Sequence, residues 1–182
     1  MRTFIAIGLP LSIRKKISQI QENLKKCNLT FKWVKPDNTH LTLKFLGSVD
    51  EEKLEQIKKI ITKTSGGFKA FGVNLEGFGF FPNAKKPRVF FINTSHQELL
   101  KSIADKLEEE LIILDFEKEG RFKSHITLAR IKDKQNLECL KKELENIKLE
   151  EEFAVEEIML YKSTLTPEGA IHEVIFKSSF PA

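Results

Sequence analysis

The order in which strand-like and helix-like segments follow one another limits the fold of this chain more than any other feature of its sequence. Apolar residues recur every three or four positions in the helix-like segments, as at Ile13, Ile17, Ile20 and Leu24, which gives such a helix one apolar side. Several strand candidates follow one another without an intervening helix, so neighbouring strands can pair directly. The sequence therefore predicts an α+β fold with mainly antiparallel sheets, and not a doubly wound parallel sheet, which needs strict alternation.

The same patterns place the individual elements. Helices are predicted after Pro10, after Asp50 as the N-terminal cap, and over residues 97–111 and 137–147. Residues 68–81, rich in Phe and Gly, predict one bent strand or a hairpin. The other strands are predicted over residues 3–8, 31–34, 40–46, 88–93, 122–131, 153–161 and 171–176.

Length and composition restrict the class of protein. With 182 residues, 41% of them hydrophobic and 31% charged, the chain is predicted to form a single domain over residues 1–182 and not a disordered segment. No apolar run approaches the ~20 residues that span a bilayer, so no membrane partner is expected. The formal net charge of +4 is compatible with an anionic partner but does not require one.

The few cysteines bear on metal chemistry and on the cellular compartment. Cys27 and Cys139 alone cannot build a disulfide framework or a zinc site, and we interpret them as unpaired. The N-terminal residues lack the pattern of a signal peptide. Unpaired cysteines without an export signal predict a cytoplasmic protein, and the chain offers no motif for a metal.

One tetrapeptide occurs twice. Residues 40–43 read His-Leu-Thr-Leu (the first motif) and residues 125–128 read His-Ile-Thr-Leu (the second motif), so two of the four histidines head the same pattern. A duplicated half-fold would explain the apolar positions but has no need of histidine. A single His-x-Thr is more often a hydrogen-bonded structural feature of a strand, whereas the matched pair indicates a functional site.

Strand geometry separates the polar from the apolar residues of each motif, because side chains alternate between two faces. In residues 40–45 the even positions share one face, which places Lys44 with His40, and the apolar odd positions share the other. In residues 125–130 the odd positions, which include the histidine and the threonine, share one face, and Ile126 and Leu128 lie on the opposite face. The apolar faces belong to the core, so both motifs present an imidazole and a hydroxyl elsewhere, toward solvent or a shared cleft.

Two imidazoles and two hydroxyls on one surface suit phosphodiester chemistry. Histidine titrates near neutral pH, so one ring can accept a proton while the other donates one. Cleavage of a phosphodiester needs such a pair, a base for the attacking oxygen and an acid for the leaving oxygen. The hydroxyls of Thr42 and Thr127 can donate to the non-bridging oxygens as charge develops, and no metal is required.

At these residues the chain resembles the two-histidine phosphoesterases, and more closely the bacterial and archaeal RNA 2′,3′-cyclic phosphodiesterases, also called 2′-5′ RNA ligases. The resemblance covers nearly the whole chain. It implies a bilobal α+β fold with pseudo-twofold lobes, in which two mainly antiparallel sheets form a central cleft and helices lie on the outer faces. The segments that carry it are Arg-Thr-Phe-Ile-Ala-Ile at 2–7, Asn-Thr-His-Leu-Thr-Leu-Lys-Phe-Leu-Gly at 38–47, Gly-Phe-Gly at 77–79, Phe-Pro-Asn at 81–83, Arg-Val at 88–89, His-Ile-Thr-Leu-Ala-Arg at 125–130 and Ser-Thr-Leu-Thr-Pro at 163–167.

The resemblance also implies the reaction, which is hydrolysis of a 2′,3′-cyclic phosphate at the end of an RNA or oligonucleotide to a 2′-phosphomonoester, without ATP, metal or other cofactor. It implies that His40 is the proton donor and His125 the proton acceptor, and that Thr42, Thr127 and Arg130 bind the substrate. The residues themselves do not separate the two histidine roles, because the two motifs look alike. No obligate protein partner is evident.

Some neighbouring residues depart from the expected pattern. Members of the family often have Pro before the second motif, where this chain has Ser124; the basic residues in 121–123 can still reach a phosphate. Parity places Arg130 on the face opposite His125 in a regular strand, and only a bulge or a strand end would bring it to phosphate. His172 follows a turn and can line the site.

Two kinds of alternative remain at this point. The same site could join RNA ends through a 2′-5′ linkage, which reverses the reaction at a related bond, or hydrolyse a small cyclic nucleotide. A protein of another class, a non-catalytic RNA-binding module, could use Phe-rich strands such as residues 78–81 and 90–91 to stack bases. The more frequent role of such Phe residues is in the core.

Overall fold

The computed structural model describes all 182 residues, which form four α-helices and nine strands. The helices are α1 (Leu11–Lys25), α2 (Glu51–Ser65), α3 (Gln97–Leu111) and α4 (Glu138–Glu145), with the short 3-10 turns η1 (Pro36–Asn38) and η2 (Ile112–Leu114). The strands are β1 (Arg2–Gly8), β2 (Lys32–Trp33), β3 (His40–Ser48), β4 (Phe71–Phe81), β5 (Val89–Thr94), β6 (His125–Arg130), β7 (Glu152–Val155), β8 (Glu157–Thr166) and β9 (Gly169–Ser179).

All strand pairs are antiparallel, and the strands join into one connected sheet in the order β7-β4-β5-β6-β3-β1-β8-β9, with β2 paired to β6. The α+β class with antiparallel strands is thereby confirmed. The structure has one connected sheet where two were expected, and its halves meet between β3 and β6 at a single registered pair, Leu41 with Ile126. The pseudo-twofold lobes and the central cleft stay predictions.

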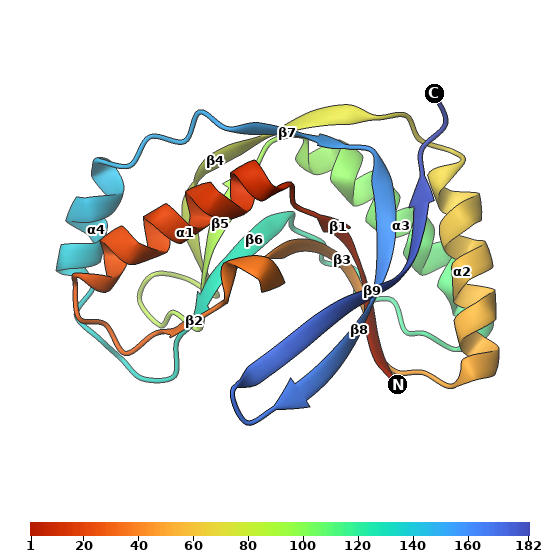
Figure 1. Cartoon of the computed structure of the whole chain (residues 1–182), viewed down its shortest axis with the longest axis horizontal. Coiled ribbons are helices and arrows are strands. Elements are labelled where there is room, and N and C mark those ends of the chain that lie inside the picture. The colour runs from red at the N-terminus through yellow and green to blue at the C-terminus, as the bar shows by residue number, and fades with distance from the viewer.

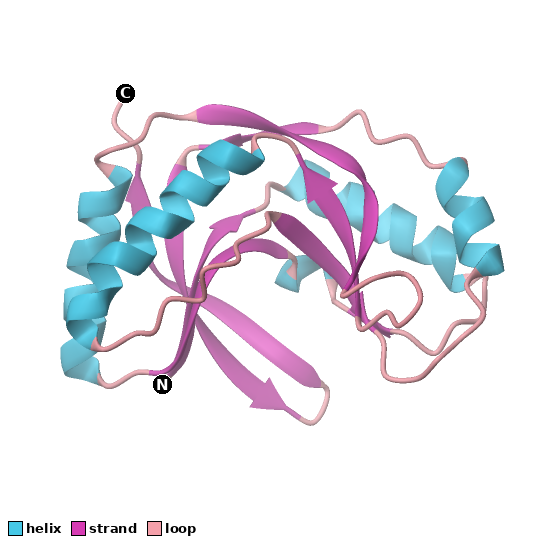
Figure 2. Ribbon diagram, turned by 180° about the vertical axis from the view of Figure 1, so that it is seen from behind, coloured by secondary structure: helices cyan, strands magenta, loops and turns pink.

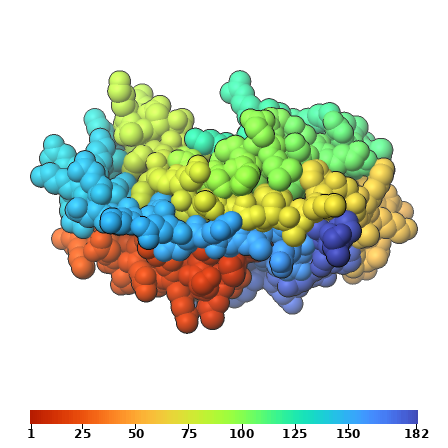
Figure 3. Space-filling model, turned by 90° about the horizontal axis from the view of Figure 1, so that it is seen from above, coloured from red at the N-terminus to blue at the C-terminus, as the bar shows by residue number.

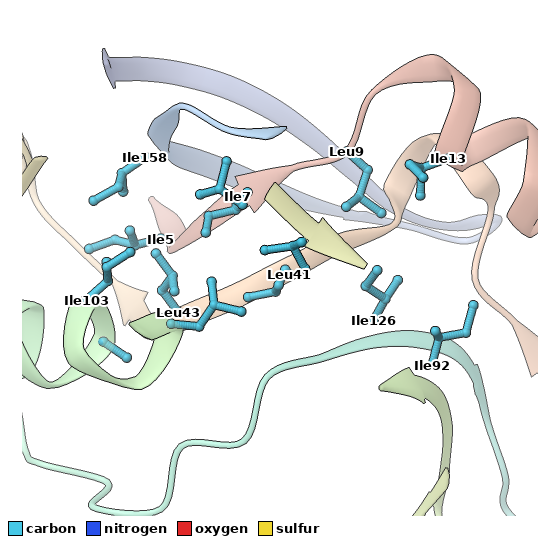
Figure 4. Close-up of a cluster of buried hydrophobic side chains, with 14 of the residues drawn as sticks. Ile5, Ile7, Leu9, Ile13, Leu41, Leu43, Ile92, Ile103, Ile126 and Ile158 are labelled. Carbon is cyan, nitrogen blue, oxygen red and sulfur yellow. The ribbon is translucent and has the colours of Figure 1, made fainter. Parts of the chain in front are cut away.

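The main hydrophobic core lies between one face of this sheet and the helices. Figure 4 shows its centre, where Ile5 and Ile7 of β1, Leu41 of β3 and Ile126 of β6 meet side chains from the helices. Thirty-six buried residues belong to this cluster, drawn from all four helices and from strands in both halves of the sheet. Helices therefore cover the face that bears the apolar residues of both motifs, as the sequence predicts.

The helices lie in two pairs at the two ends of the molecule (Figure 1). α1 lies beside α4, and α2 packs beside α3 and against β8 and β9. The far ends of β8 and β9 form a hairpin that projects from the body, which Figure 2 shows from behind. None of the helices is both long enough and apolar enough to cross a bilayer.

Most predicted elements are present within a few residues, and Asp50 caps α2 by accepting a hydrogen bond from the Lys53 backbone N–H at 2.8 Å. Residues 71–81 form one strand with a register shift, and not a hairpin. The strand predicted over 153–161 is wrong, because the chain changes partners there: β7 pairs with β4, whereas β8 pairs with β1 and β9. Apolar alternation along a segment does not reveal such a change of partner.

The interpretation of the cysteines as unpaired is also wrong. Cys27, just after α1, and Cys139, in α4, form a disulfide whose Cα atoms lie 5.7 Å apart. The pairing of α1 with α4 brings together residues 112 positions apart in sequence, which spacing alone could not show. The cytoplasmic location stays a prediction, but it loses the argument from free thiols.

Candidate functional site

His40 and His125 lie on the same face of the sheet. Leu41 and Ile126 are Cα partners and are both fully buried in the core, so the residues on either side of each point to the opposite face. We call that surface, which carries His40, Thr42, His125 and Thr127, the histidine face. In a regular antiparallel pair, His40 and His125 would be diagonal neighbours, about 7–8 Å apart at Cα.

Both imidazole rings are held by the same local hydrogen bond. Nδ1 of His40 lies 2.8 Å from the Asn38 carbonyl oxygen, and Nδ1 of His125 lies 2.7 Å from the Lys123 carbonyl oxygen. A carbonyl can only accept, so Nδ1 of each ring donates the hydrogen bond. In the neutral ring the proton therefore sits on Nδ1, and Nε2 is left as the basic nitrogen that exchanges protons.

Aromatic rings surround His40. Phe4 stacks on it with centroids 4.6 Å apart, Tyr161 stacks on Phe4 at 5.0 Å, and the edge of His172 lies 5.4 Å away. Burial, with smaller contributions from the nearby His172 and His125, lowers the pKa of His40 to about 4, although the bond to Asn38 opposes this. In the protein without substrate, His40 is neutral at pH 7.

His125 has a more cationic environment. It lies edge-on to Phe81 at 4.8 Å and to Phe91 at 5.3 Å, and the Lys123 ammonium lies over the same two rings, 5.6 Å and 5.3 Å from their centroids. Burial lowers the pKa of His125, and the charge of Lys123 adds to that effect. A neutral His125 next to an exposed cation suits a proton acceptor that receives an anionic substrate.

Thr42 and Thr127 lie beside the histidines on the histidine face. Both are partly buried, and neither hydroxyl makes a hydrogen bond within the chain. A hydroxyl can donate one hydrogen bond to an oxygen of a bound phosphate. The structure thus brings the four residues predicted from the two motifs to one surface.

A β-bulge follows the threonine in both motifs. Ile5 and Ala6 pair with Lys44 and Thr42, which leaves Leu43 as an extra residue in β3. The bulge reverses the alternation beyond it. Lys44 therefore points into the core side and is only 4% exposed, while Phe45 lies on the histidine face with 55% exposure. The prediction that Lys44 shares the face of His40 is wrong for this reason.

The second bulge changes the position of Arg130. Phe90 and Phe91 pair with Ala129 and Thr127, so Leu128 is the extra residue of β6. Ala129 is buried in the core, and the exposed Arg130 lies on the histidine face with Thr127. Parity in a regular strand predicts the opposite face, and the bulge corrects that prediction. A contact between Arg130 and the substrate stays a prediction.

Lys44 connects the first motif to the loop before the second. Its ammonium donates to Oε1 of Glu108 at 2.9 Å and to the Glu117 carbonyl at 2.7 Å, and lies 3.3 Å from Oε1 of Glu119. Glu108 Oε1 also accepts from the backbone N–H of Glu119 at 2.8 Å, and the bond from Lys44 helps lower the pKa of Glu108 against the opposing effect of burial. The loop that leads to His125 is thus fastened to β3 from the core side.

Ser124, where relatives often have Pro, is fully buried and hydrogen-bonded. Its hydroxyl lies 2.5 Å from the Thr94 hydroxyl. The Gln97 side chain accepts from the Ser124 N–H at 2.9 Å and donates to its carbonyl at 3.0 Å. These bonds fix the backbone just before His125. The chain that leads into the second motif is therefore held in place even though it has Ser124 where relatives often have Pro.

The sequence did not identify Phe4 and Tyr161 as neighbours of His40, whereas it did predict basic groups near the second motif in residues 121–123, where Lys123 lies over the rings beside His125. The signal for Phe4 and Tyr161 lies in the order of the strands, because β1 pairs with β3 and β8 pairs with β1. His172 does line the site, beside His40, and its Nδ1 is buried without a partner. Phe90 lies in the main core, as the sequence favours, whereas Phe91 packs beside His125.

A family model described as LigT-like phosphoesterase matches the chain twice, over residues 7–91 and residues 90–172. Each match contains one of the two motifs. The two matches together span most of the chain.

Curated relatives and solved structures agree with this match. A protein named RNA 2′,3′-cyclic phosphodiesterase from Thermotoga maritima is 38% identical over 99% of this chain and 96% of its own length. A protein of the same name from Methanocaldococcus jannaschii is 38% identical over 96% of this chain and 98% of its own.

Among solved structures, a protein from Thermus thermophilus superposes with a TM-score of 0.83 at 30% identity, covering 99% of this chain and 98% of its own. The structure of Escherichia coli LigT with 3′-AMP shares the fold, with a TM-score of 0.75 at 23% identity over 100% of this chain and 98% of its own. With both motifs on one face, and with these matches along nearly its whole length, this chain belongs to the LigT-like phosphoesterase family.

Proposed function

We propose that this protein hydrolyses the 2′,3′-cyclic phosphate at the end of an RNA and leaves a 2′-phosphomonoester. The observation that carries the proposal is the matched pair of histidines, each donating from Nδ1 to a backbone carbonyl so that Nε2 is available for proton exchange. Relatives named RNA 2′,3′-cyclic phosphodiesterase, 38% identical over nearly the whole chain, support the choice of substrate.

The proposed reaction is an attack of water on the cyclic phosphorus. His125 takes a proton from the water as a bond forms between the water oxygen and phosphorus. The bond from phosphorus to the ribose O3′ breaks, and His40 gives its proton to O3′. The products are a 2′-phosphate and a free 3′-hydroxyl, and each histidine then holds the other's initial protonation state, which exchange with water resets.

Thr42 and Thr127 donate hydrogen bonds to the non-bridging oxygens in this proposal, and Arg130 and Lys123 add positive charge on the β6 side. These groups stabilise the charge that develops on phosphorus oxygens during attack. Two imidazoles and two hydroxyls supply the acid, the base and the hydrogen-bond donors, so we propose that the reaction uses neither a metal nor another cofactor.

His40 must carry a proton to act as the donor, although burial lowers its pKa to about 4 in the free protein. An anionic phosphate next to the ring favours the charged form and raises that pKa when the substrate binds. Substrate binding therefore prepares the donor, while His125 near Lys123 remains the neutral acceptor.

The test is product analysis on an RNA oligonucleotide that ends in a 2′,3′-cyclic phosphate. We expect a 2′-phosphate product, unchanged turnover in EDTA, and a loss of roughly 10²-fold or more in His40→Asn and in His125→Asn. His96→Asn is the matched control, because His96 is exposed and has left-handed backbone geometry that Asn tolerates.

Other outcomes separate the alternatives. Joined RNA ends as the main product would indicate a ligase, and turnover of cyclic mononucleotides without turnover of RNA would indicate a small-molecule phosphodiesterase. RNA binding without turnover would indicate a binding module. Full activity in both motif variants would refute the two-histidine mechanism, and loss of activity in EDTA would refute its independence of metal.

A further inference from the structure

Four exposed cations gather where β6 ends. Lys32 of β2 is the Cα partner of Arg130, and Arg130 is also the partner of Val89, the residue after Arg88. The Ile131 N–H donates to the Arg88 carbonyl at 2.9 Å, and Nη1 of Arg88 donates to the Lys132 carbonyl at 2.8 Å. Backbone pairing thus holds together the group that we call the basic edge: Lys32, Arg88, Arg130 and Lys132.

The basic edge has no carboxylate partners. None of the ion pairs in the chain involves any of its four members. Residues 77–97 and 120–132, which supply β5, β6 and part of β4, contain no Asp or Glu. Asp133 follows Lys132 in sequence but forms no ion pair with the edge. The positive charge of this edge is therefore not neutralised within the chain.

β6 connects the basic edge directly to the site. His125 begins the strand and Arg130 ends it, and the bulge at Leu128 places both on the histidine face. At about 3.3 Å of rise per residue, with one residue taken up by the bulge, the two ends lie about 13 Å apart. Figure 3 shows the β4–β5 turn (yellow-green) and the loop before β6 (blue-green) projecting on either side of a hollow.

β3 offers no comparable path for a polyanion. The residue that corresponds to Arg130 after the first bulge is Phe45, which is exposed and apolar. The cation of that strand, Lys44, is buried and paired with Glu108. An extended anion bound at the two histidines therefore meets a row of exposed cations along β6, whereas the cations on the β3 side are two isolated residues, Arg2 near His172 and Arg14 near Tyr161.

We propose that the basic edge binds the phosphodiester backbone of single-stranded RNA on the 5′ side of the cyclic end. This inference rests on the proposed function and specifies its substrate as an oligonucleotide. A cyclic phosphate closes the 3′ end, so the rest of the RNA can continue only in the 5′ direction. A cyclic mononucleotide meets Arg130 at most, whereas the next phosphates of an oligonucleotide extend to Lys32, Arg88 and Lys132.

The experiment compares kcat/KM for a short single-stranded RNA ending in 2′,3′-cyclic phosphate with kcat/KM for a 2′,3′-cyclic mononucleotide. The variant is Lys32→Gln with Lys132→Gln, because neither side chain makes a hydrogen bond or ion pair. The matched control is Lys59→Gln with Lys69→Gln, which removes the same amount of positive charge. Both lysines are exposed and unpaired; Lys59 lies in α2 and Lys69 lies just after it.

We expect the edge variant to lose roughly tenfold in kcat/KM for the oligonucleotide and to keep its kcat/KM for the mononucleotide within about twofold. The slope of log kcat/KM against log salt for the oligonucleotide should become shallower by about 1.4, since each lost phosphate contact on a single strand contributes about 0.7. The control variant should match the unaltered protein with both substrates.

An equal loss with both substrates, or no loss with the oligonucleotide, would overturn the inference. Either result leaves the proposed function intact, because the mononucleotide still reports turnover. If the unaltered protein turns over neither substrate, the proposed function fails. Anisotropy of a labelled RNA with the edge variant and the control then tests the edge separately, and equal binding would overturn it.

Discussion

The strands β3 and β6 use the same backbone device in different surroundings. Each begins with a histidine whose Nδ1 donates to the carbonyl two residues before it, and each has a bulge at the leucine that ends its motif. His40 lies among aromatic rings, with Phe45 beyond the bulge. His125 lies beside Lys123, with Arg130 beyond the bulge.

This difference shows how one repeated motif can supply two roles. The backbone fixes the position of each imidazole and hydroxyl, while neighbouring strands set the environment of each ring. The β3 side is the more buried and more apolar, and it lowers the pKa of its histidine to about 4. The β6 side is lined by cations that can receive the phosphate. The predictions below change one side at a time, from the largest expected effect to the smallest.

Lys44 and Ala129 occupy corresponding positions on the core side of the two strands, and only the first carries a charge. Replacing Lys44 by Met leaves the largely buried Glu108 without its partner and should lower the free energy of unfolding by roughly 3–5 kcal/mol. Urea unfolding measures this loss, and the double variant with Glu108→Gln should recover much of it.

The control is Lys63→Met, which breaks an exposed ion pair with Glu110 on the same helix, α3, and should have a much smaller effect. A loss no larger than in Lys63→Met would show that the buried pair does not hold the loop.

The two threonines test whether the hydroxyls act equally. Thr42→Val and Thr127→Val each remove one donor to phosphate and should each lower kcat by roughly 10²–10³-fold. Thr62→Val is the control, because the Thr62 hydroxyl only donates to the Lys58 carbonyl on α2. Single-turnover rates on a cyclic-phosphate RNA measure the effect. If only one variant loses activity, a single hydroxyl contacts the reacting phosphate and the two sides are functionally unequal.

The pH dependence of kcat/KM reports both histidines in the free protein. Burial lowers the pKa of His40 to about 4 and also lowers the pKa of His125 from its ordinary 6.5. The reaction needs one ring charged and one neutral. Activity therefore decreases at a pH below both pKa values, where both rings are charged, and at a pH above both, where both rings are neutral. We expect the maximum of kcat/KM between about pH 4 and pH 6.5, with up to roughly a tenfold fall per pH unit above it. A maximum above about pH 7 with a cyclic mononucleotide would contradict these assignments.

Phe45 and Arg130 occupy corresponding positions on the histidine face. Arg130→Gln should raise KM for a cyclic mononucleotide roughly tenfold, about 1.4 kcal/mol, because it removes a charge from the phosphate side. Phe45→Gln should change KM less than about twofold, since no charge is lost there. Steady-state kinetics with both variants measures the contrast, and equal effects would show that charge beyond the bulge does not distinguish the two strands.

Much of this site could be predicted because the motif repeats and strand side chains alternate. Alternation placed the histidines and threonines opposite the buried Leu41 and Ile126, and the structure has them there. It failed for Lys44 and Arg130, because a bulge depends on how a strand pairs with its neighbour and not on its own residues. Phe4 and Tyr161 were missed for a related reason, since the order of the strands in the sheet brings them to His40.

The elements of the fold likewise separate into those that depend on local sequence, which could be predicted, and those that depend on distant partners, which could not. Helices with one apolar stripe were placed to within a few residues, because their pattern is local. The division of residues 153–161 between β7 and β8 depends on partners at opposite ends of the sheet. The disulfide likewise depends on α1 and α4 meeting, although the two cysteines stand far apart in sequence.

That disulfide makes a closed covalent ring of residues 27–139, and both histidine motifs lie within it. One arc of the ring is the peptide chain from one motif to the other, and the second arc runs through the sulfur–sulfur bond. A single proteolytic nick anywhere between Cys27 and Cys139 would therefore open the ring without releasing either motif. Only a nick between the motifs combined with reduction would divide the chain into two fragments with one motif each.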